Sequence, residues 1–324
     1  MTPRVGIVGA GLAGLTLARK LREHADVTVL EKSRGSGGRI ATRYADPYRF
    51  DHGAQFFTVR DARFRAFLQP LLSAGVIAEW PARFAEITAG TVTATRRWDS
   101  DYPHYVGTPG MNAIGQALAD GLDVVRAATV TGVERGDDHW NVQIDNAASR
   151  TFDWLFVTTP NSQARALLPE SALPTVTMLP CYSLMLGFAS PHDLGWDAAL
   201  IRGADISWVS VNSSKPGRPA VPCWLVHSTN RWAAAHLDDD ESTVIAHLLA
   251  ATAESTGCTD KPAHVGLHRW RYANVDRQHG ETFYLSTEHK LGVCGDWCIR
   301  GRIEAAFVSA MSLVDAVTEH LPSA

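Results

Sequence analysis

The stretch VGIVGAGLAGL, from Val5 to Leu15, decides the fold of this chain. It begins with an apolar run that is typical of a buried parallel strand, and Gly9, Gly11 and Gly14 follow with the G-x-G-x-x-G spacing. Gly9 allows a tight turn, Gly11 lets the backbone approach a pyrophosphate, and Gly14 lets the next helix pack closely on the sheet. The stretch therefore predicts the strand, turn and helix of a dinucleotide-binding unit.

The residues after this stretch complete a βαβ unit. Apolar residues continue at helical spacing to Leu21, and a second apolar run from Val27 to Leu30 ends at Glu31. An acid at this position accepts hydrogen bonds from the hydroxyls of an adenosine ribose, and its charge disfavours the ribose phosphate of NADP. A secretory signal segment is the weaker interpretation, because the charged region before the apolar run is short and the glycines are positioned.

The composition indicates an ordinary globular protein with one elaborate domain or two. The chain has 324 residues, of which 45% are hydrophobic and 20% charged, and its net charge is −4. Nothing in this balance predicts a nucleic-acid, membrane or obligate protein partner, and no apolar run reaches the ~20 residues of a membrane span. The five cysteines are an odd, scattered set without a disulfide framework, so we expect a reducing, cytoplasmic compartment.

Four segments in the middle of the chain predict further strands. Phe152 to Val157 is a near-continuous apolar run, which favours another central parallel strand. The segments 124–133 and 140–144 alternate apolar and polar residues, which predicts antiparallel strands. Short β-like segments between Leu184 and Leu225 alternate with Pro and Gly turns, and this pattern favours a sheet that walls a substrate cavity.

The C-terminal part is expected to return to the first domain. Residues 242–253 predict a helix, residues 291–294 a strand, and an apolar stripe from Ile303 to Val317 an amphipathic helix that follows Gly295-Asp296. A strand, a Gly-Asp turn and a helix N-terminus can form a site for an anion or dipole. A plain helix that closes the sheet is an equally good interpretation of this segment alone.

Taken together, the motifs resemble the flavin amine oxidase superfamily. They are VGIVGAGLAGL with Glu31, RGSGGR at 34–39, FDHGAQFF at 50–57 and GDWCIRGRIEAAF at 295–307. FDHGAQFF, together with HRWRY at 268–272, adds a likeness to the renalase family within it. The resemblance implies an α/β fold of the amine oxidase and p-hydroxybenzoate hydroxylase type. Its Rossmann-like FAD-binding domain would comprise 1–60, 105–165 and 290–324, and a mixed-sheet α+β substrate domain 61–104 and 166–289.

The resemblance also implies how the cofactor is held. Arg39 with the glycines before it would lie against the pyrophosphate and ribityl chain, Asp296 would hold the same region, and the helix starting near Ile303 would point its positive end at the flavin. FAD would be bound without a covalent bond, and no metal ligand is expected. The residues expected to contact FAD are Gly9, Gly11, Ala13, Gly14, Glu31, Lys32, Gly37, Gly38, Arg39, Gln55, Phe56, Val130, Asp296 and Ile303.

The activity that the resemblance implies is the oxidation of a reduced pyridine nucleotide. Renalases oxidise 2- or 6-dihydro isomers of NAD(P)H to NAD(P)+ by hydride transfer to flavin N5, with oxygen reduced to hydrogen peroxide. Gln55 and Phe56 would border the flavin, and His227 and Trp270 would line the nicotinamide pocket. Each has a structural alternative: Gln55 can satisfy backbone groups after Gly53, His227 can be an ordinary hydrogen-bonded residue, and Trp270 can be core packing.

Two other functions stay open at this point. The first is a flavin amine oxidase or a related desaturase on the same fold, whose facing aromatic rings and water-holding lysine the sequence does not locate. The second belongs to another class, a redox-sensing flavoprotein with little turnover.

Overall fold

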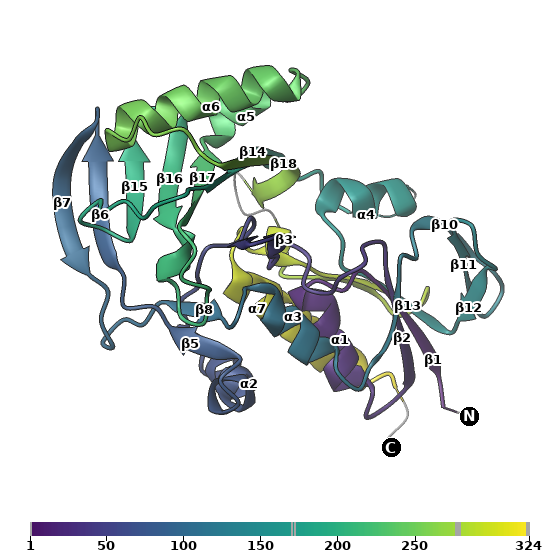
Figure 1. Ribbon diagram of the computed structural model, residues 1–324. Helices are drawn as coiled ribbons and strands as arrows, with labels where there is room; N and C mark the ends of the chain where they lie inside the picture. The colour runs from purple at the N-terminus through teal and green to yellow at the C-terminus, as the bar shows by residue number, and fades with distance from the viewer. Residues whose placement is uncertain (1, 170, 172, 276–279, 322–324) are drawn as a thin grey trace.

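Two large sheets organise the chain in the computed structural model, which describes residues 2–169, 171, 173–275 and 280–321 (Figure 1). The first sheet has six strands in the order β19-β20-β13-β1-β2-β9, and every pairing is parallel except that of β19 with β20. Its strands are β1 (Arg4–Val8), β2 (Asp26–Glu31), β9 (Asp123–Arg126), β13 (Trp154–Val157), β19 (Tyr284–Ser286) and β20 (Leu291–Val293).

One face of this sheet is covered by helices. Val5 and Ile7 of β1 point to this face because side chains alternate along a strand, and both are fully buried in one core with residues of α1 and α7. Figure 1 shows α1, α3 and α7 beside the sheet, and α1 contacts both of the others. The helices are α1 (Leu12–Leu21), α3 (Asn112–Ala119) and α7 (Ile303–Thr318). The predicted βαβ unit and the predicted C-terminal helix are therefore confirmed.

A small antiparallel sheet covers the opposite face. Val8 and Leu30 point to this side and share a second core with Trp140 and Val142 of the small sheet. Its strands are β10 (Val130–Arg135), β11 (Trp140–Ile144) and β12 (Arg150–Phe152). The six-stranded sheet is thus buried on both faces, which explains why its strands are nearly continuous apolar runs.

The prediction of one antiparallel strand over 124–133 was wrong. The segment divides at Ala127, whose φ of +54° lies in the left-handed region and ends the extended backbone. The part before the division is β9, which pairs in parallel with β2, and the part after it is β10, which pairs antiparallel with β11. Alternation alone does not reveal which sheet a strand joins, because pairing depends on distant partners.

The second large sheet has seven strands in the order β18-β14-β17-β16-β15-β6-β7, antiparallel apart from β6 beside β15. Its strands are β6 (Arg83–Thr88), β7 (Thr91–Arg97), β14 (Met178–Gly187), β15 (Ala198–Arg202), β16 (Ile206–Val211), β17 (Cys223–Ser228) and β18 (His264–Val275). Helices α5 (Asn230–Ala235) and α6 (Glu241–Thr256) cover its outer face, where Trp232 and Leu248 pack against Leu184 and Val226 (Figure 1). The other face is free to wall a cavity.

Short elements join the two sheets. They are the hairpin β3 (Arg43–Ala45) and β4 (Tyr48–Phe50), the pair β5 (Ile77–Glu79) and β8 (Tyr105–Gly107), α2 (Ala62–Ser73), α4 (Asn161–Leu167), and the 3-10 turns η1 (Asn212–Ser214) and η2 (Asp296–Cys298). Strand β19 belongs to the six-stranded sheet although it falls in the range 166–289 predicted for the substrate domain. The predicted strand at 291–294 and helix at 242–253 form as β20 and α6.

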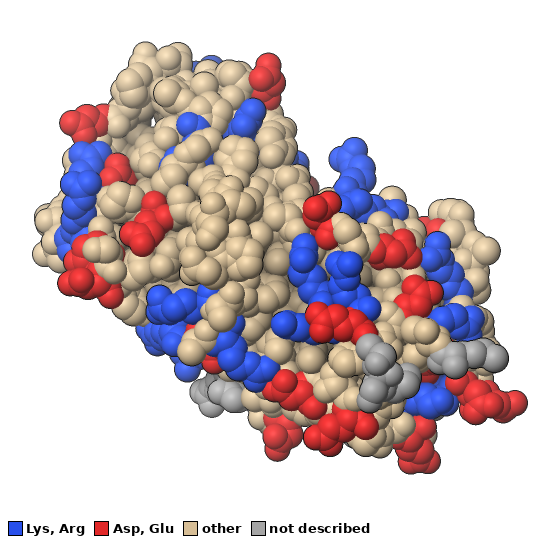
Figure 2. Space-filling model, turned by 90° about the horizontal axis from the view of Figure 1, so that it is seen from below, with Lys and Arg blue, Asp and Glu red and all other residues tan. Residues whose placement is uncertain are grey.

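The surface carries both signs of charge. In the face seen from below, acidic and basic side chains are intermixed, and neither sign covers the face (Figure 2). None of the helices within the described residues combines the length and the apolar character that crossing a bilayer requires.

Candidate active site

A large cavity opens at the carboxyl ends of β1, β2, β13 and β20 and extends to the free face of the seven-stranded sheet. Its volume is about 1830 Å³, which exceeds the roughly 300–1,000 Å³ of a pocket for one small ligand. Every residue that the sequence predicts to contact FAD lines this cavity, with the exception of Gly14, and so do His227 and Trp270. The cavity therefore has room for a dinucleotide and a second molecule.

The three glycines of the first turn differ in what surrounds them. A Cβ at Gly14 would lie 1.9 Å from the carbonyl oxygen of Gly9, so Gly14 serves the close packing of α1 on β1 and does not line the cavity. A Cβ at Gly11 would meet nothing within 4 Å, although Gly11 does line the cavity. The open space above Gly11 is where a pyrophosphate can approach the backbone and the N-terminus of α1.

Glu31 is held in place by the backbone on either side of the turn. Its Oε2 accepts a hydrogen bond from the Ala10 N–H at 2.7 Å, and its Oε1 accepts one from the Ser33 N–H at 2.8 Å. Each carboxylate oxygen keeps a further lone pair. The buried carboxylate can therefore accept the two hydroxyls of a ribose, with Lys32 and Val130 on the same wall.

The RGSGGR loop is joined to the first turn. The Gly37 N–H donates to the Ala10 carbonyl at 2.8 Å, and Gly37 and Gly38 have φ values of +118° and +58°, which favour glycine. Arg39 does not lie free in the cavity, because its Nη2 donates to Oδ1 of Asp296 at 2.5 Å. Arg39 and Asp296 were each expected to contact the cofactor, and the structure pairs them across 257 residues of chain.

Asp296 begins η2, and α7 begins a few residues later. The Asp296 carboxylate is 8% exposed, and Arg302, the N-cap residue of α7, and Ile303, its first residue, line the cavity. The N-terminus of α7 thus presents its partial positive charge to the cavity. A helix end in this place favours electron-rich groups such as the pyrimidine edge of a reduced flavin.

Gln55 is buried, and its amide is saturated by protein partners. Its Nε2 donates to the carbonyls of Asp51 at 2.5 Å and Gly53 at 3.0 Å. Its Oε1 accepts from Ser210 Oγ at 2.9 Å and from Lys215 Nζ at 3.1 Å. These bonds support the structural alternative for Gln55, since its amide has no position left for a ligand.

Behind Gln55 lies a buried charge network that sequence reasoning missed. The Asp51 carboxylate is fully enclosed and pairs with Lys215 Nζ at 3.2 Å and Arg218 Nη2 at 2.6 Å. Burial lowers the pKa of Lys215 to about 8, against the opposing effect of Asp51. Burial acts to raise the pKa of Asp51, but the two cations outweigh it and the pKa is lowered. The network joins the segment that follows β4 to the segment that follows η1, and no local sequence signal indicates this pairing.

Strands of the seven-stranded sheet form the cavity wall opposite the glycine turn at 9–14. The register of these strands decides which side chains face the cavity. Pairing places His268, Ser183, His227 and Trp208 in a row across β18, β14, β17 and β16. Paired residues share a face of the sheet, and the two histidines and Trp208 line the cavity. Trp270 lies two residues after His268 on the same face, and its Nε1 donates to the His52 carbonyl at 2.8 Å. His227 on β17 and Trp270 on β18 thus both line the cavity, from strands separated by β14.

The imidazoles on this wall of the cavity are held neutral. The His52 ring stacks on Trp270 at 5.2 Å between centroids, and the His268 ring meets both edge-on. Burial lowers the pKa of His52 to about 3 and the pKa values of His227 and His268 to about 4. His52 and His268 lie within FDHGAQFF and HRWRY, but their contact with Trp270 depends on long-range pairing that the motifs do not contain.

Phe56 belongs to a second aromatic group on the same cavity. Its ring lies 4.7 Å from Trp98, 5.0 Å from His104 and 5.6 Å from Trp208 between centroids. Phe56, His104 and Trp208 line the cavity. The space between the glycine cradle and the β14–β18 wall is therefore bordered by flat rings, which suits a planar heterocycle.

Comparison with known proteins places this site in a family. Residues 7–71 match a family described as an NAD(P)-binding Rossmann-like domain. Residues 60–318, most of the chain, match the family described as flavin containing amine oxidoreductase.

Two solved structures share the fold. A putative protoporphyrinogen oxidase from Exiguobacterium sp. 255-15 superposes with a TM-score of 0.80 at 12% identity, over 99% of each chain. Wild-type putrescine oxidase bound to putrescine gives a TM-score of 0.71 at 12% identity, over 98% of this chain and 99% of the other. The open cradle at Gly11, the fixed Glu31 carboxylate and the α7 N-terminus fit the dinucleotide and flavin parts of FAD. The chain therefore belongs to the flavin-containing amine oxidoreductase family, and its cofactor is FAD.

Proposed function

We propose that this protein oxidises a dihydropyridine nucleotide in the manner of the renalases. A 2- or 6-dihydro isomer of NAD(P)H is converted to NAD(P)+, and oxygen takes up the electrons as hydrogen peroxide. The observation that carries the proposal is the group of neutral imidazoles on the cavity wall that also holds Trp270. Their pKa values of about 3 to 4 make His52, His227 and His268 uncharged at pH 7 and weak as bases.

Weak bases suit a dihydropyridine better than an amine. FAD, when bound, supplies the hydride acceptor, and loss of a hydride makes the pyridine ring aromatic without removal of a proton. An alkylammonium with a pKa of about 10 must first lose a proton. An imidazole with a pKa of about 4 is poorly matched to accept it.

Neutral rings also suit the product. Oxidation turns an uncharged dihydropyridine into a pyridinium cation, which protonated histidines would repel. The indole of Trp270, stacked on His52 on one side, would offer its other flat, electron-rich face to that cation. Its ring is fixed by the bond to the His52 carbonyl, so the face is oriented before the substrate arrives.

The charges around the cavity favour a substrate that carries phosphate. Arg271, half of whose side chain is exposed, follows Trp270, and Arg302 lies at the start of α7. Among the described residues, the lining carboxylates are Glu31, Asp296, Glu304 and Glu241. The first three accept protein hydrogen bonds, and Glu241 is exposed in the first turn of α6. The two buried carboxylates among them, Glu31 and Asp296, are thus engaged by backbone N–H groups and by Arg39, so a cationic amine meets no enclosed carboxylate that lacks a partner, whereas phosphate oxygens meet arginines.

We further propose that FAD is bound without a covalent bond. Cys181 lines the cavity, and burial raises the pKa of its thiol to about 12. A thiol that stays protonated at neutral pH is a poor nucleophile.

Anaerobic reduction tests the proposed substrate. The FAD-loaded protein is mixed with 2-dihydro-NAD, 6-dihydro-NAD or putrescine, and flavin absorbance is followed by stopped flow. We expect rapid bleaching by a dihydropyridine isomer and none by putrescine, and admission of oxygen should restore the colour with formation of hydrogen peroxide. Bleaching by the amine alone would establish the amine oxidase alternative. Inertness to all three would favour the redox sensor.

A variant of the cavity wall and a control variant test whether His227 takes part in flavin reduction. His227→Ala should slow flavin reduction at least tenfold, by about 1.4 kcal/mol in the barrier, and leave FAD bound. His247→Gln is the matched control, since His247 lies on α6 in a surface pair with Asp205. An unchanged reduction rate in His227→Ala would remove His227 from the substrate site.

A further inference from the structure

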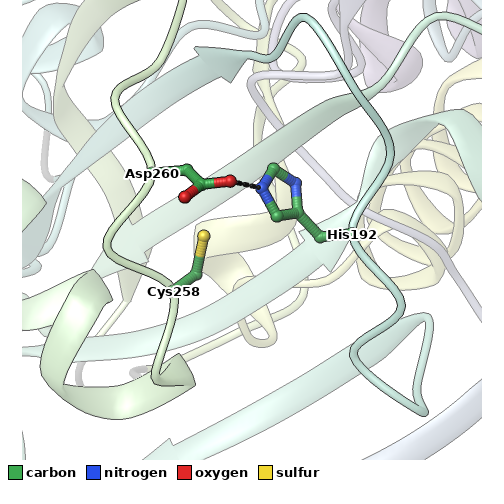
Figure 3. A group of neighbouring side chains, drawn as sticks. All are labelled: His192, Cys258 and Asp260. Atoms are coloured by element: carbon green, nitrogen blue, oxygen red, sulfur yellow. Dashed lines mark hydrogen bonds and ion pairs between the residues drawn. The ribbon is translucent and has the colours of Figure 1, made fainter.

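A second group of reactive side chains lies outside the cavity. His192 is in the loop between β14 and β15, and Cys258 and Asp260 lie between α6 and β18. Pairing of β14 with β18 sets Gly187 opposite His264, so both loops leave the same end of the sheet. One ligand atom from each of the three side chains lies within 4.8 Å of the other two (Figure 3).

The ring of His192 is fixed before any ligand arrives. It packs edge-on against Phe188 and Trp224, with centroids 4.6 and 5.2 Å away, and its side chain is 17% exposed. Its Nδ1 is buried without a hydrogen-bond partner, which leaves Nε2 as the accessible nitrogen. Nε2 lies 2.8 Å from Oδ2 of Asp260.

The arrangement is not that of a nucleophilic triad. In a triad the nucleophile and the orienting acid contact different nitrogens of the histidine. Here Nδ1 is enclosed, and Figure 3 shows the Cys258 sulfur pointing toward the pair formed by Asp260 and Nε2 of His192. Sulfur, carboxylate oxygen and imidazole nitrogen therefore converge on one point.

We propose that His192, Cys258 and Asp260 bind one zinc ion, with water completing the coordination. Thiolate, imidazole and carboxylate are the three ligand types that Zn²⁺ prefers in proteins. In a tetrahedral site with bond lengths of about 2.0–2.3 Å, the ligand atoms lie about 3.3–3.8 Å apart. The 2.8 Å between His192 Nε2 and Asp260 Oδ2 must widen by about 0.5 Å, and the separations to the Cys258 sulfur, which are at most 4.8 Å, must close by up to about 1 Å. The Asp260 side chain is 73% exposed and Cys258 is half-buried in a loop, so both can make these shifts.

Zinc at this point would join two loops of the substrate domain. None of the three ligands lines the flavin cavity, so the ion would take no part in the flavin chemistry. Binding replaces the S–H bond of Cys258 by a zinc–sulfur bond and releases the proton to solvent. The sequence gives no hint of this site, because His192 and Asp260 are 68 residues apart and the cysteine spacing matches no zinc motif.

Calorimetric titration of zinc into the FAD-loaded full chain tests the proposal. The protein is first treated with a chelator, and the titration is done in a phosphine reductant, because thiol reductants compete for zinc, with excess Mg²⁺ to saturate weak carboxylate sites. We expect one Zn²⁺ per chain, with affinity at least tenfold weaker in Cys258→Ser and Asp260→Asn. Zinc should raise the thermal unfolding temperature of the parent protein more than that of Cys258→Ser.

The matched control is His247→Gln, which removes another surface histidine paired with an aspartate, at 3.0 Å. It should bind zinc as the parent does. Cobalt provides a second measurement, since tetrahedral Co²⁺–thiolate absorption beyond the flavin bands should appear in the parent and be absent in Cys258→Ser. Equal zinc affinity in parent and Cys258→Ser, or no cobalt–thiolate absorption in the parent, would overturn the proposal.

Discussion

Burial determines the charge of three side chains around the cavity, those of His52, His227 and His268. Burial is the main cause of each lowered pKa, because an imidazolium loses its hydration when it is enclosed. Neighbouring positive groups add to the effect: Arg43 acts on His52 and His268, and Lys215 acts on His227. The fold therefore keeps three rings neutral where a flat, uncharged substrate is expected.

These lowered pKa values predict how stability depends on pH. The ordinary histidine pKa is 6.5, and the folded values are about 3 to 4. As the pH falls from 6.5 to about 4, the unfolded chain takes up protons that the folded chain does not, so these groups lower the free energy of unfolding. Each contributes at most about 1.4 kcal/mol per pH unit. Urea unfolding with FAD in fixed excess, at several values of pH in this window, measures the slope.

The variant His268→Gln measures how much His268 alone contributes to this pH dependence. Glutamine does not titrate here, so the variant should lose up to one proton from the pH dependence of unfolding and keep its bound FAD at pH 7. The full slope in this variant would contradict the lowered pKa of His268.

At the residue scale, sequence patterns locate the cavity better than they assign roles within it. Glu31 was predicted from the length of the βαβ unit, and its carboxylate stands in the expected place because the spacing is local. The saturation of Gln55 depends on Ser210 and Lys215, more than 150 residues away. The pairing of Asp51 with Lys215 and Arg218 is equally remote, so no local pattern announces it.

At the scale of elements, two glycines of the turn between β1 and α1 serve different purposes, one in helix packing and the other in ligand binding. Gly14→Ala would place a Cβ 1.9 Å from a backbone oxygen, and the helix would have to move away from the strand. Gly11→Ala places a methyl group in open space, and the Gly11 backbone, with φ −73° and ψ 178°, accepts alanine. The two glycines of one motif therefore have different physical requirements.

Gly11→Ala is expected to fold like the parent and to bind FAD at least tenfold more weakly, because its methyl group occupies the space of the pyrophosphate. Gly14→Ala is expected to lower the thermal unfolding temperature of the cofactor-free protein. Circular dichroism measures folding, and quenching of FAD fluorescence measures binding. Parent-like FAD affinity in Gly11→Ala would show that the cofactor does not approach this turn.

Helices and strands are predicted correctly where the periodicity of one segment is enough to identify them. The strand and helix of 4–21 and the helix of 303–318 have clear periods, and both were predicted near their observed bounds. The segment 124–133 was misread because Ala127 breaks it with an unusual φ for a residue with a side chain. Assignment of β19 to the six-stranded sheet likewise requires its partner β20, which lies after a turn.

At the scale of the whole molecule, the two halves of the cofactor site come from opposite ends of the chain. The ion pair of Arg39 with Asp296 fastens the RGSGGR loop to the segment before α7. Arg39 also donates from Nη1 to the Ala273 carbonyl at 3.1 Å, which adds the end of β18 to the same junction. A ligand that touches both segments should therefore stabilise the entire fold, since its binding requires both to be in place.

Asp296→Asn tests this coupling with little change in volume. FAD binds the folded state, so saturating FAD raises the unfolding temperature by an amount that depends on its affinity. Loss of the carboxylate releases Arg39 and weakens the junction, and we expect at least tenfold weaker FAD binding, or about 1.4 kcal/mol less stabilisation at saturation. Asp315→Asn is the matched control, because Asp315 pairs with Arg63 across the same two ends of the chain but on the exposed surface. An FAD-dependent shift in Asp296→Asn equal to that of the control would mean that the junction forms independently of the cofactor, and that FAD is held by the N-terminal cradle alone.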